Sequence, residues 1–234
     1  MTTTSTSPFL TASWRDLCLV TWAVPDALLA PHVPAGLELD RWEGSALVSL
    51  VAFRFEDTRV FGLPWPGFTA FPELNLRVYV RRGDCRGVCF VREYVPSPVV
   101  AWIARTVYNE PYRAAPYRAE ATRHVLNVGG RKHSIEWDTR GAAEVPGPDT
   151  LAHFLKEHDT GFGRARSGET RAYRVEHPTW RAWLDVESEL DVDFGLLYGN
   201  EWSVLGTMAP RSVIVAEGSP VQVFGAASLD LLCE

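Results

Sequence analysis

Lysine is scarce in this chain of 234 residues, in which Lys132 and Lys156 are the only two. Chemistry that depends on a Schiff-base amine therefore has two candidates at most. Lys132 follows the Gly129-Gly130 turn, and Lys156 lies on one face of a predicted helix. We expect both lysines to be solvated.

The sequence also lacks the signatures of membrane, secreted and nucleic-acid-binding proteins. No segment approaches the roughly 20 apolar residues of a membrane span, and Met1–Ser7 has neither a basic nor a long apolar stretch. A formal net charge of −6 provides no positive field for nucleic acid or anionic lipid. We therefore expect neither nucleic acid nor a membrane as a partner. The spacing of the four cysteines gives no sign of paired disulfides, so we expect reduced thiols and a cytoplasmic protein. They are Cys18, Cys85, Cys89 and Cys233.

No metal or nucleotide motif is present. His153 and His158 are separated by about 140° around a helix, and neither H-E-x-x-H nor C-x-x-C occurs. Gly161-Phe162-Gly163 follows a predicted helix instead of a strand, which does not fit a dinucleotide loop and predicts a flexible surface loop. There is no G-x-S-x-G nucleophile motif. We expect neither a metal nor a cofactor.

Many short strand patterns with few helices indicate an antiparallel barrel or sandwich. With 46 % apolar residues, the chain can form a sizeable core, and we expect one domain over residues 1–234 with residues 1–8 flexible. Helices are predicted over 26–32, 98–108 and from 149 or 150 to 158. Strands are predicted over 14–24, 46–55, 73–80, 87–95, 117–128, 131–138, 172–176, 183–190, 212–217 and 221–228.

Three smaller patterns add detail. A Gly129-Gly130 turn predicts a hairpin that places Arg123 opposite Glu136. Acidic residues at every second position from Asp185 to Asp191 are typical of a solvated edge strand. His177 precedes Trp180, and it is either a packed core histidine or a proton carrier in a pocket wall.

The most informative segment is residues 73–80, in which every second side chain is polar. A β-strand would place the aliphatic residues on one face and a carboxylate, an amide, a guanidinium and a phenol on the other, at steps of about 7 Å. Such a row either lines a pocket or is the solvated face of an amphipathic strand. The polar residues are Glu73, Asn75, Arg77 and Tyr79.

Further motifs extend over nearly the whole chain. They are Trp14 and Trp22 with Val24-Pro25, the segment Pro34–Asp40, Phe71-x-Glu73-x-Asn75-x-Arg77-x-Tyr79-Val80, Gly87-Val88-x-Phe90, Ala104-Arg105, Pro111-Tyr112 and His177-Pro178-x-Trp180. In these motifs the chain resembles the DUF2071 (YqjF-like) family, which is related to acetoacetate decarboxylase. The resemblance implies a mainly antiparallel β fold, in which a cone-like barrel with two or three short helices encloses a small-molecule cavity.

The decarboxylases carry their Schiff-base lysine just after a proline that follows a helix, and the similar place here is Tyr112. A phenol cannot form an imine. The leading hypothesis is a cofactor-free lyase, isomerase or cyclase that acts on an organic acid or ketone. Glu73 would be its general acid or base, and Tyr112 would stabilise developing charge.

Asn75, Arg77 and Tyr79 would bind the substrate of such an enzyme, with Arg77 clamping a carboxylate or enolate oxygen. A second hypothesis is a non-catalytic binding protein for a hydrophobic carboxylate. A third is a buried Glu73–Arg77 ion pair that only stabilises the barrel. The sequence leaves the oligomeric state open, a homo-oligomer included.

Overall fold

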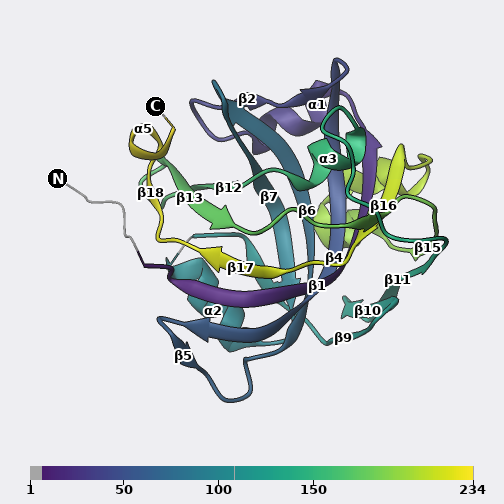
Figure 1. The fold of residues 1–234 in the computed structure, drawn as a ribbon, viewed down its shortest axis with the longest axis horizontal. Coiled ribbons are helices and arrows are strands. Elements are labelled where there is room, and N and C mark those ends of the chain that lie inside the picture. Colours follow the sequence, from purple (N-terminus) through teal and green to yellow (C-terminus); the bar gives the residue numbers. More distant parts are fainter. Residues whose placement is uncertain (1–6, 108, 234) are drawn as a thin grey trace.

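A closed barrel of seven strands forms the centre of the computed structural model, which describes residues 7–107 and 109–233 (Figure 1). Direct pairing of the first barrel strand with the last closes the ring. In order around the ring, the strands are β1 (Leu10–Ala23), β17 (Pro220–Val223), β13 (Thr170–Glu176), β12 (Thr160–Arg164), β7 (Cys85–Val95), β6 (Phe71–Arg82) and β4 (Ser45–Val60).

Shorter strands extend the barrel at several edges. Neighbouring strands are antiparallel, except that β12 and β8 each pair with β7 in parallel. The predicted β-barrel is therefore confirmed, with a mixed instead of a purely antiparallel sheet. The added strands are β2 (Glu38–Leu39), β3 (Arg41–Trp42), β5 (Leu63–Pro64), β8 (Tyr112–Ala114), β14 (Ala182–Trp183), β16 (Ser212–Ala216) and β18 (Ala227–Ser228).

A second, four-stranded sheet packs against the outside of the barrel. Its central hairpin turns at Gly129-Gly130 and pairs Arg123 with Glu136, as predicted, and their side chains form an ion pair of 2.9 Å. The acidic strand β15 lies at one edge of this sheet, also as predicted. The strands are β9 (Tyr117–Glu120), β10 (Arg123–Val128), β11 (Arg131–Thr139) and β15 (Val186–Asp191).

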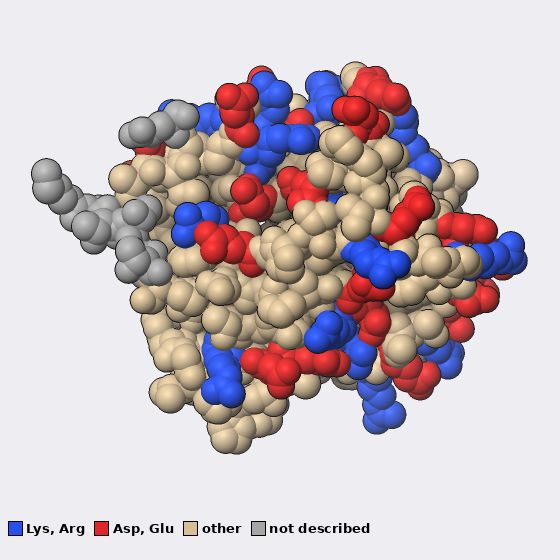
Figure 2. Space-filling model, in the orientation of Figure 1, with Lys and Arg blue, Asp and Glu red and all other residues tan. Residues whose placement is uncertain are grey.

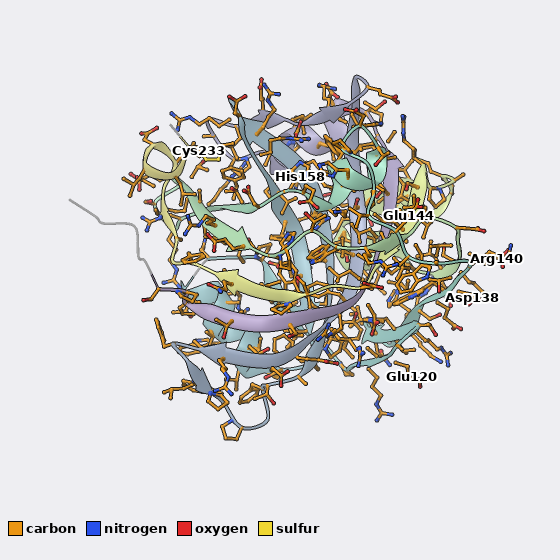
Figure 3. All side chains as sticks on the ribbon, viewed as in Figure 1. Glu120, Asp138, Arg140, Glu144, His158 and Cys233 are labelled. Carbon is orange, nitrogen blue, oxygen red and sulfur yellow. A yellow bond between two sulfur atoms is a disulfide. The ribbon has the colours of Figure 1, made fainter. Side chains whose placement is uncertain are left out.

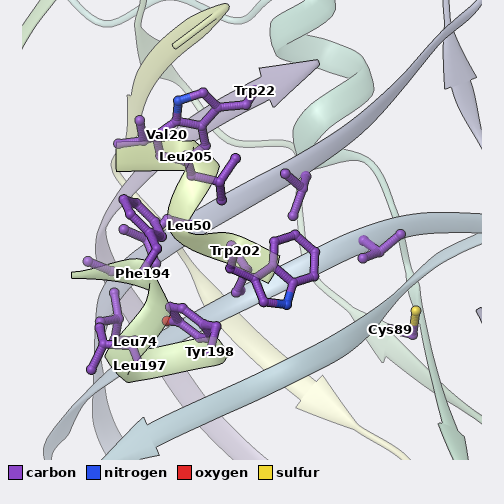
Figure 4. Close-up of a cluster of buried hydrophobic side chains, with 14 of the residues drawn as sticks. Val20, Trp22, Leu50, Leu74, Cys89, Phe194, Leu197, Tyr198, Trp202 and Leu205 are labelled. Atoms are coloured by element: carbon purple, nitrogen blue, oxygen red, sulfur yellow. The ribbon is translucent and has the colours of Figure 1, made fainter. Parts of the chain in front are cut away.

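The main hydrophobic core lies between the barrel and this second layer. The aliphatic face of β6, which includes Leu74 and Leu76, packs there as predicted for alternating side chains. Trp22, Tyr198 and Trp202 fill the same cluster (Figure 4). Packing of this face leaves the polar face of β6 directed to the barrel interior.

Helices cover the barrel, and two of them contribute to its interior. Figure 1 shows α3 near the top of the barrel and α2 near its bottom. The helix predicted to begin at Pro98 is confirmed, and the Thr150 side chain caps α3 by accepting a hydrogen bond from the His153 amide. Tyr108, the predicted last residue of the helix that begins at Pro98, lies outside the described residues. The helices are α1 (Asp26–Leu29), η1 (Ala30–His32), α2 (Pro98–Val107), α3 (Leu151–Lys156), α4 (Phe194–Tyr198), η2 (Asn200–Gly206) and α5 (Leu229–Leu232). None of the helices in residues 7–107 and 109–233 has the length and apolar character needed to cross a bilayer.

Two sequence expectations are wrong. Gly161-Phe162-Gly163 is not a surface loop but part of β12, and Phe162 is fully buried. The glycines serve close packing, since a Cβ on Gly161 would lie 2.1 Å from the ring of Tyr173. Cys85 and Cys233 are not reduced thiols but form a disulfide, because α5 brings the end of the chain back to the start of β7 across a separation of 148 residues (Figure 3).

Charged side chains of both signs are interspersed over the face of the molecule in Figure 2. Many of them form exposed ion pairs, such as the pair between Arg140 and Glu187. This pattern gives no extended basic surface on that face, in line with the formal net charge of −6.

Candidate functional site

The barrel encloses a cavity of about 190 Å³. Many aromatic residues line it, and their rings contact one another: those of Phe55 and Phe71, for example, stack at 4.8 Å. Trp65 and Phe68, from the loop between β5 and β6, also line it, so that this loop covers part of the cavity. A wall of this kind suits a small organic molecule with an apolar body. The principal aromatic residues are Trp14, Phe53, Phe55, Phe71, Phe90 and Trp180.

The polar row of β6 divides into two parts. Glu73, Asn75 and Arg77 line the cavity. The prediction that Tyr79 joins them is wrong, because helix α3 covers this end of the strand. The Tyr79 ring packs against Phe154, and its hydroxyl lies 2.7 Å from the Ser49 hydroxyl.

Glu73 is the centre of a buried hydrogen-bond network. Only 2 % of the residue is exposed. Its Oε1 accepts a hydrogen bond of 3.0 Å from Asn75 Nδ2, and its Oε2 accepts one of 2.7 Å from the Tyr112 hydroxyl. Burial raises the pKa of Glu73 to about 7, although the hydrogen bonds from Asn75 and Tyr112 act in the opposite direction. Tyr112, the catalytic candidate implied by the resemblance, therefore lies beside the other catalytic candidate.

Two further buried carboxyl groups, Glu93 and Glu110, line the same end of the cavity, and sequence reasoning missed both. In the sheet, Glu93 of β7 pairs with Asn75 of β6 on one side and with Tyr112 of β8 on the other. Burial, followed by the charges of Glu73 and Glu110, raises its pKa well above the usual value. Burial also raises the pKa of Glu110 to about 8. We call Glu73, Asn75, Glu93 and Glu110 the acceptor end of the cavity.

A β-bulge explains why Glu93 escaped notice. Arg77 pairs with Phe90, but Leu76 pairs with Arg92, so Val91 is an extra residue in β7. The insertion changes which side chains point inward, and both Phe90 and Glu93 line the cavity despite an odd spacing. Regular alternation from the turn would have directed Arg92 inward instead.

Arg77 lies at the other end of the row. Its Nη2 donates to the Leu155 carbonyl at 2.7 Å, which connects β6 to α3. Among the described ion pairs none includes Arg77, and Glu73 bonds to Asn75 and Tyr112 instead. The hypothesis of a stabilising Glu73–Arg77 ion pair is therefore wrong, because each side chain has other partners. Arg77 Nη1 makes no hydrogen bond within residues 7–107 and 109–233 and remains available to a ligand.

Lys156 corrects a second expectation. Lys132 is exposed, but the Lys156 side chain is fully buried, pairs with Glu157 and lines the cavity. The α3 helix has only six residues and sits in the barrel opening, so that its end is enclosed. His158 follows beside α3 (Figure 3), and its Nε2 lies 3.0 Å from Asp40 Oδ2.

His177 combines features of both interpretations from the sequence, a packed histidine and a residue of a pocket wall. Its ring stacks on Trp180 at 4.2 Å, and both residues line the cavity. Burial lowers the pKa of His177. It is thus part of the pocket wall as well as of an aromatic cluster. In the described part of the chain, no three His, Cys, Asp or Glu side chains are arranged to hold a metal ion.

Comparison with solved structures shows the fold. Acetoacetate decarboxylase from Legionella pneumophila has a TM-score of 0.67 at 15 % identity, over 97 % of this chain and 90 % of that one. The enduracididine biosynthesis enzyme MppR, solved in complex with pyruvate, has a TM-score of 0.62 at 16 % identity, over 96 % of this chain and 91 % of that one. The barrel is therefore of the acetoacetate decarboxylase type.

Sequence comparison shows the family. The protein YqjF of Bacillus subtilis (strain 168) is 34 % identical over 191 residues, which are 77 % of each chain. Residues 11–220 match the model of DUF2071, described as an uncharacterized conserved protein. The motifs that suggested the resemblance, including the row on β6, lie in this range. The chain belongs to the DUF2071 family.

Proposed function

We propose that this protein is a cofactor-free enzyme that moves a proton on a small organic acid or ketone, with Glu73 as the general base. The observation that supports this most is the environment of Glu73, a carboxyl group with a pKa of about 7 inside an aromatic cavity. A group with a pKa near neutrality can both take up and return a proton efficiently. The name of the solved relative with bound pyruvate is consistent with a keto acid as the substrate class.

In the proposed step, ionised Glu73 removes a proton from the carbon next to the substrate carbonyl. The electron pair of the C–H bond forms a carbon–carbon double bond, and the carbonyl electron pair moves to the oxygen, which gives an enolate. Arg77 binds the enolate oxygen or the neighbouring carboxylate through its free N–H groups. In a β,γ-unsaturated substrate the enolate is conjugated, and return of the proton to the γ-carbon completes an isomerisation. In a substrate with a leaving group on the β-carbon, the enolate electrons form the α,β double bond while that group departs with its bonding electron pair, which completes a lyase reaction.

Asn75 and Tyr112 act by positioning Glu73. Both donate to its carboxyl oxygens, which fixes the carboxylate and favours its ionised form. Burial and the nearby charges of Glu73 and Glu93 raise the pKa of Tyr112 well above its usual value, so that it stays protonated as a donor. Tyr112 thus contributes a hydrogen bond where the decarboxylases have an amine.

Deuterium exchange tests the proposal. Phenylpyruvate is incubated with the protein in D2O, and loss of the signal of its C3 protons is followed by NMR. We expect faster exchange than in buffer, and a decrease of roughly 100-fold in the Glu73→Gln variant with little change in phenylpyruvate affinity. Glu176→Gln, on the exposed face of β13, is the matched control.

The outcomes separate the alternatives. Binding of phenylpyruvate without catalysed exchange would favour the non-catalytic binding protein. Unchanged exchange in Glu73→Gln, together with a lower melting temperature, would assign Glu73 a structural role and refute the catalytic one.

A further inference from the structure

The acceptor end of the cavity contains buried oxygen atoms that have no hydrogen-bond partner among the described residues. Asn75 Nδ2 and the Tyr112 hydroxyl are both used on Glu73, and Tyr173 makes a hydrogen bond to Glu110. Three buried oxygens are then left without a partner among the described residues: Asn75 Oδ1, Glu93 Oε2 and Glu110 Oε1. Buried polar atoms are rarely unpaired, and each of them calls for an explanation.

These three atoms belong to residues that line the cavity and are at most 5 % exposed. They come from β6, from β7 and from the segment before β8. Strand pairing places Glu93 opposite Asn75, and Glu110 lies beside β12, where a Cβ on Gly163 would lie 3.0 Å from its Oε1. Three separate segments thus contribute residues with unpaired acceptors to the wall of one cavity.

From this arrangement we propose that the acceptor end binds a cationic nitrogen of the substrate, an amine or a guanidine. The proposal rests on the proposed function only in treating the cavity as the substrate site. A primary ammonium carries three N–H donors and no acceptor, which equals the number of unpaired oxygens. The described residues form no metal-ion site here, which favours an organic cation.

The carboxyl groups of the acceptor end favour a cation over a neutral hydroxyl, because a bound cation lowers their pKa and stabilises their ionised forms. Glu73, Glu93 and Glu110 interact with one another, and the other titratable groups that interact with them are the phenols and thiol of Tyr112, Tyr117, Tyr173, Tyr198 and Cys89, none of which is cationic. Arg77 is two strand positions from Asn75, about 7 Å along β6. A substrate with a carboxylate at Arg77 and a cationic nitrogen at the acceptor end would be neutral overall and would satisfy both ends.

Benzylamine and benzyl alcohol form the test pair, since they differ only in the donor group that reaches the carboxyl cluster. Binding is measured near neutral pH by isothermal titration calorimetry. We expect benzylamine to bind at least about 10-fold more tightly, which is the gain of one charge-assisted hydrogen bond. Glu93→Gln and Glu110→Gln should each remove most of this preference, while Glu176→Gln should retain it.

A second readout separates a binding role from a structural one. A bound cation lowers the pKa of the surrounding carboxyl groups, so binding should release protons. Titration in two buffers of different ionisation enthalpy measures that release, and we expect less of it in Glu110→Gln. A structural role of Glu110 alone would not produce this difference.

Three results would overturn the proposal. The first is that benzyl alcohol binds as tightly as benzylamine, the second is that benzylamine shows no measurable binding, and the third is that the preference for benzylamine survives both substitutions. The first result would indicate that ordered water satisfies the three oxygens. Failure here leaves the proposed function intact if phenylpyruvate exchange still depends on Glu73. Conversely, benzylamine binding without any exchange would support the cation site and refute the catalytic role.

Discussion

At the scale of single residues, Arg77 offers the sharpest test of how the cavity recognises an anion. Its Nη2 is used on the Leu155 carbonyl, and its Nη1 is free to bind a ligand. Lysine preserves the charge, but its single nitrogen cannot both replace Nη2 at the Leu155 carbonyl and occupy the position of Nη1. We expect Arg77→Lys to weaken phenylpyruvate binding by about 1 to 3 kcal/mol, measured by calorimetry. The control is Arg174→Lys, at an exposed site on β13, and equal affinities of both variants would contradict the anchoring role of Arg77.

Lys156 raises a separate question, because it places an amine in the cavity wall. Its Nζ is paired with the Glu157 carboxylate, and an ammonium ion engaged in this way has no lone pair with which to attack a carbonyl. We expect borohydride treatment in the presence of phenylpyruvate to leave no reduced adduct, as judged by intact-mass spectrometry. An adduct on Lys156 that abolishes exchange would replace the Glu73 mechanism with an imine mechanism.

The single residues also show where sequence reasoning reached its limit. The alternation of residues 73–80 predicted that Glu73, Asn75 and Arg77 share one surface, because side-chain direction in a strand is a local property. Whether Tyr79 joins them depends on α3, which is remote in sequence and covers it. The burial of Lys156 could not be predicted for the same reason, because the sequence of a short amphipathic helix does not determine which part of the barrel the helix will pack against.

At the scale of elements, the contact between β7 and β12 depends on a missing side chain. A Cβ on Gly87 would lie 2.1 Å from the Thr160 carbonyl oxygen, so the two parallel strands would have to separate. We expect Gly87→Ala to lower the melting temperature by roughly 5 °C or more. Gly225→Ala is the control, because its Cβ would contact nothing within 4 Å and its backbone is not left-handed. Similar melting temperatures for both variants would show that the strands can adjust.

The strands also differ in how well the sequence predicted them. The β10–β11 hairpin was predicted correctly, because a tight turn between alternating segments is recorded in neighbouring residues. β12 was misread as a loop, because its two glycines have the composition of a turn. Close packing requires these glycines, because Tyr173 of β13 and Glu110 of the segment before β8 lie against them.

At the scale of the whole molecule, three buried carboxyl groups make stability depend on pH. The pKa of Glu110 is about 8 in the folded protein and near its usual value of 4.5 in the unfolded chain. Between these two pH values the folded state holds the additional proton, so the free energy of unfolding decreases as the pH rises. Above about pH 8 the cost of the buried charge is fully present.

Comparing variants isolates this contribution. Histidines with lowered pKa values, such as His124, give the opposite slope below about pH 6.5, so the wild-type curve alone is ambiguous. We expect the melting temperature of Glu110→Gln, relative to that of the wild type, to rise between about pH 5 and pH 8. The rise should be about 2–4 °C for each kcal/mol by which the buried charge lowers the free energy of unfolding of the wild type. Parallel curves for the two proteins would contradict the burial of Glu110, and Glu176→Gln should follow the wild type.

The closed ring of strands has a consequence for how far the sequence can vary. On the long barrel strands β4 and β6, the side chains that build the outer core and those that line the cavity occupy alternate positions, apart from the bulges. Substitutions inside can therefore accumulate without disturbing the packing outside. A barrel of this kind can keep its strands while its interior residues change, which fits the fold that this chain shares with the acetoacetate decarboxylase from Legionella pneumophila at 15 % identity.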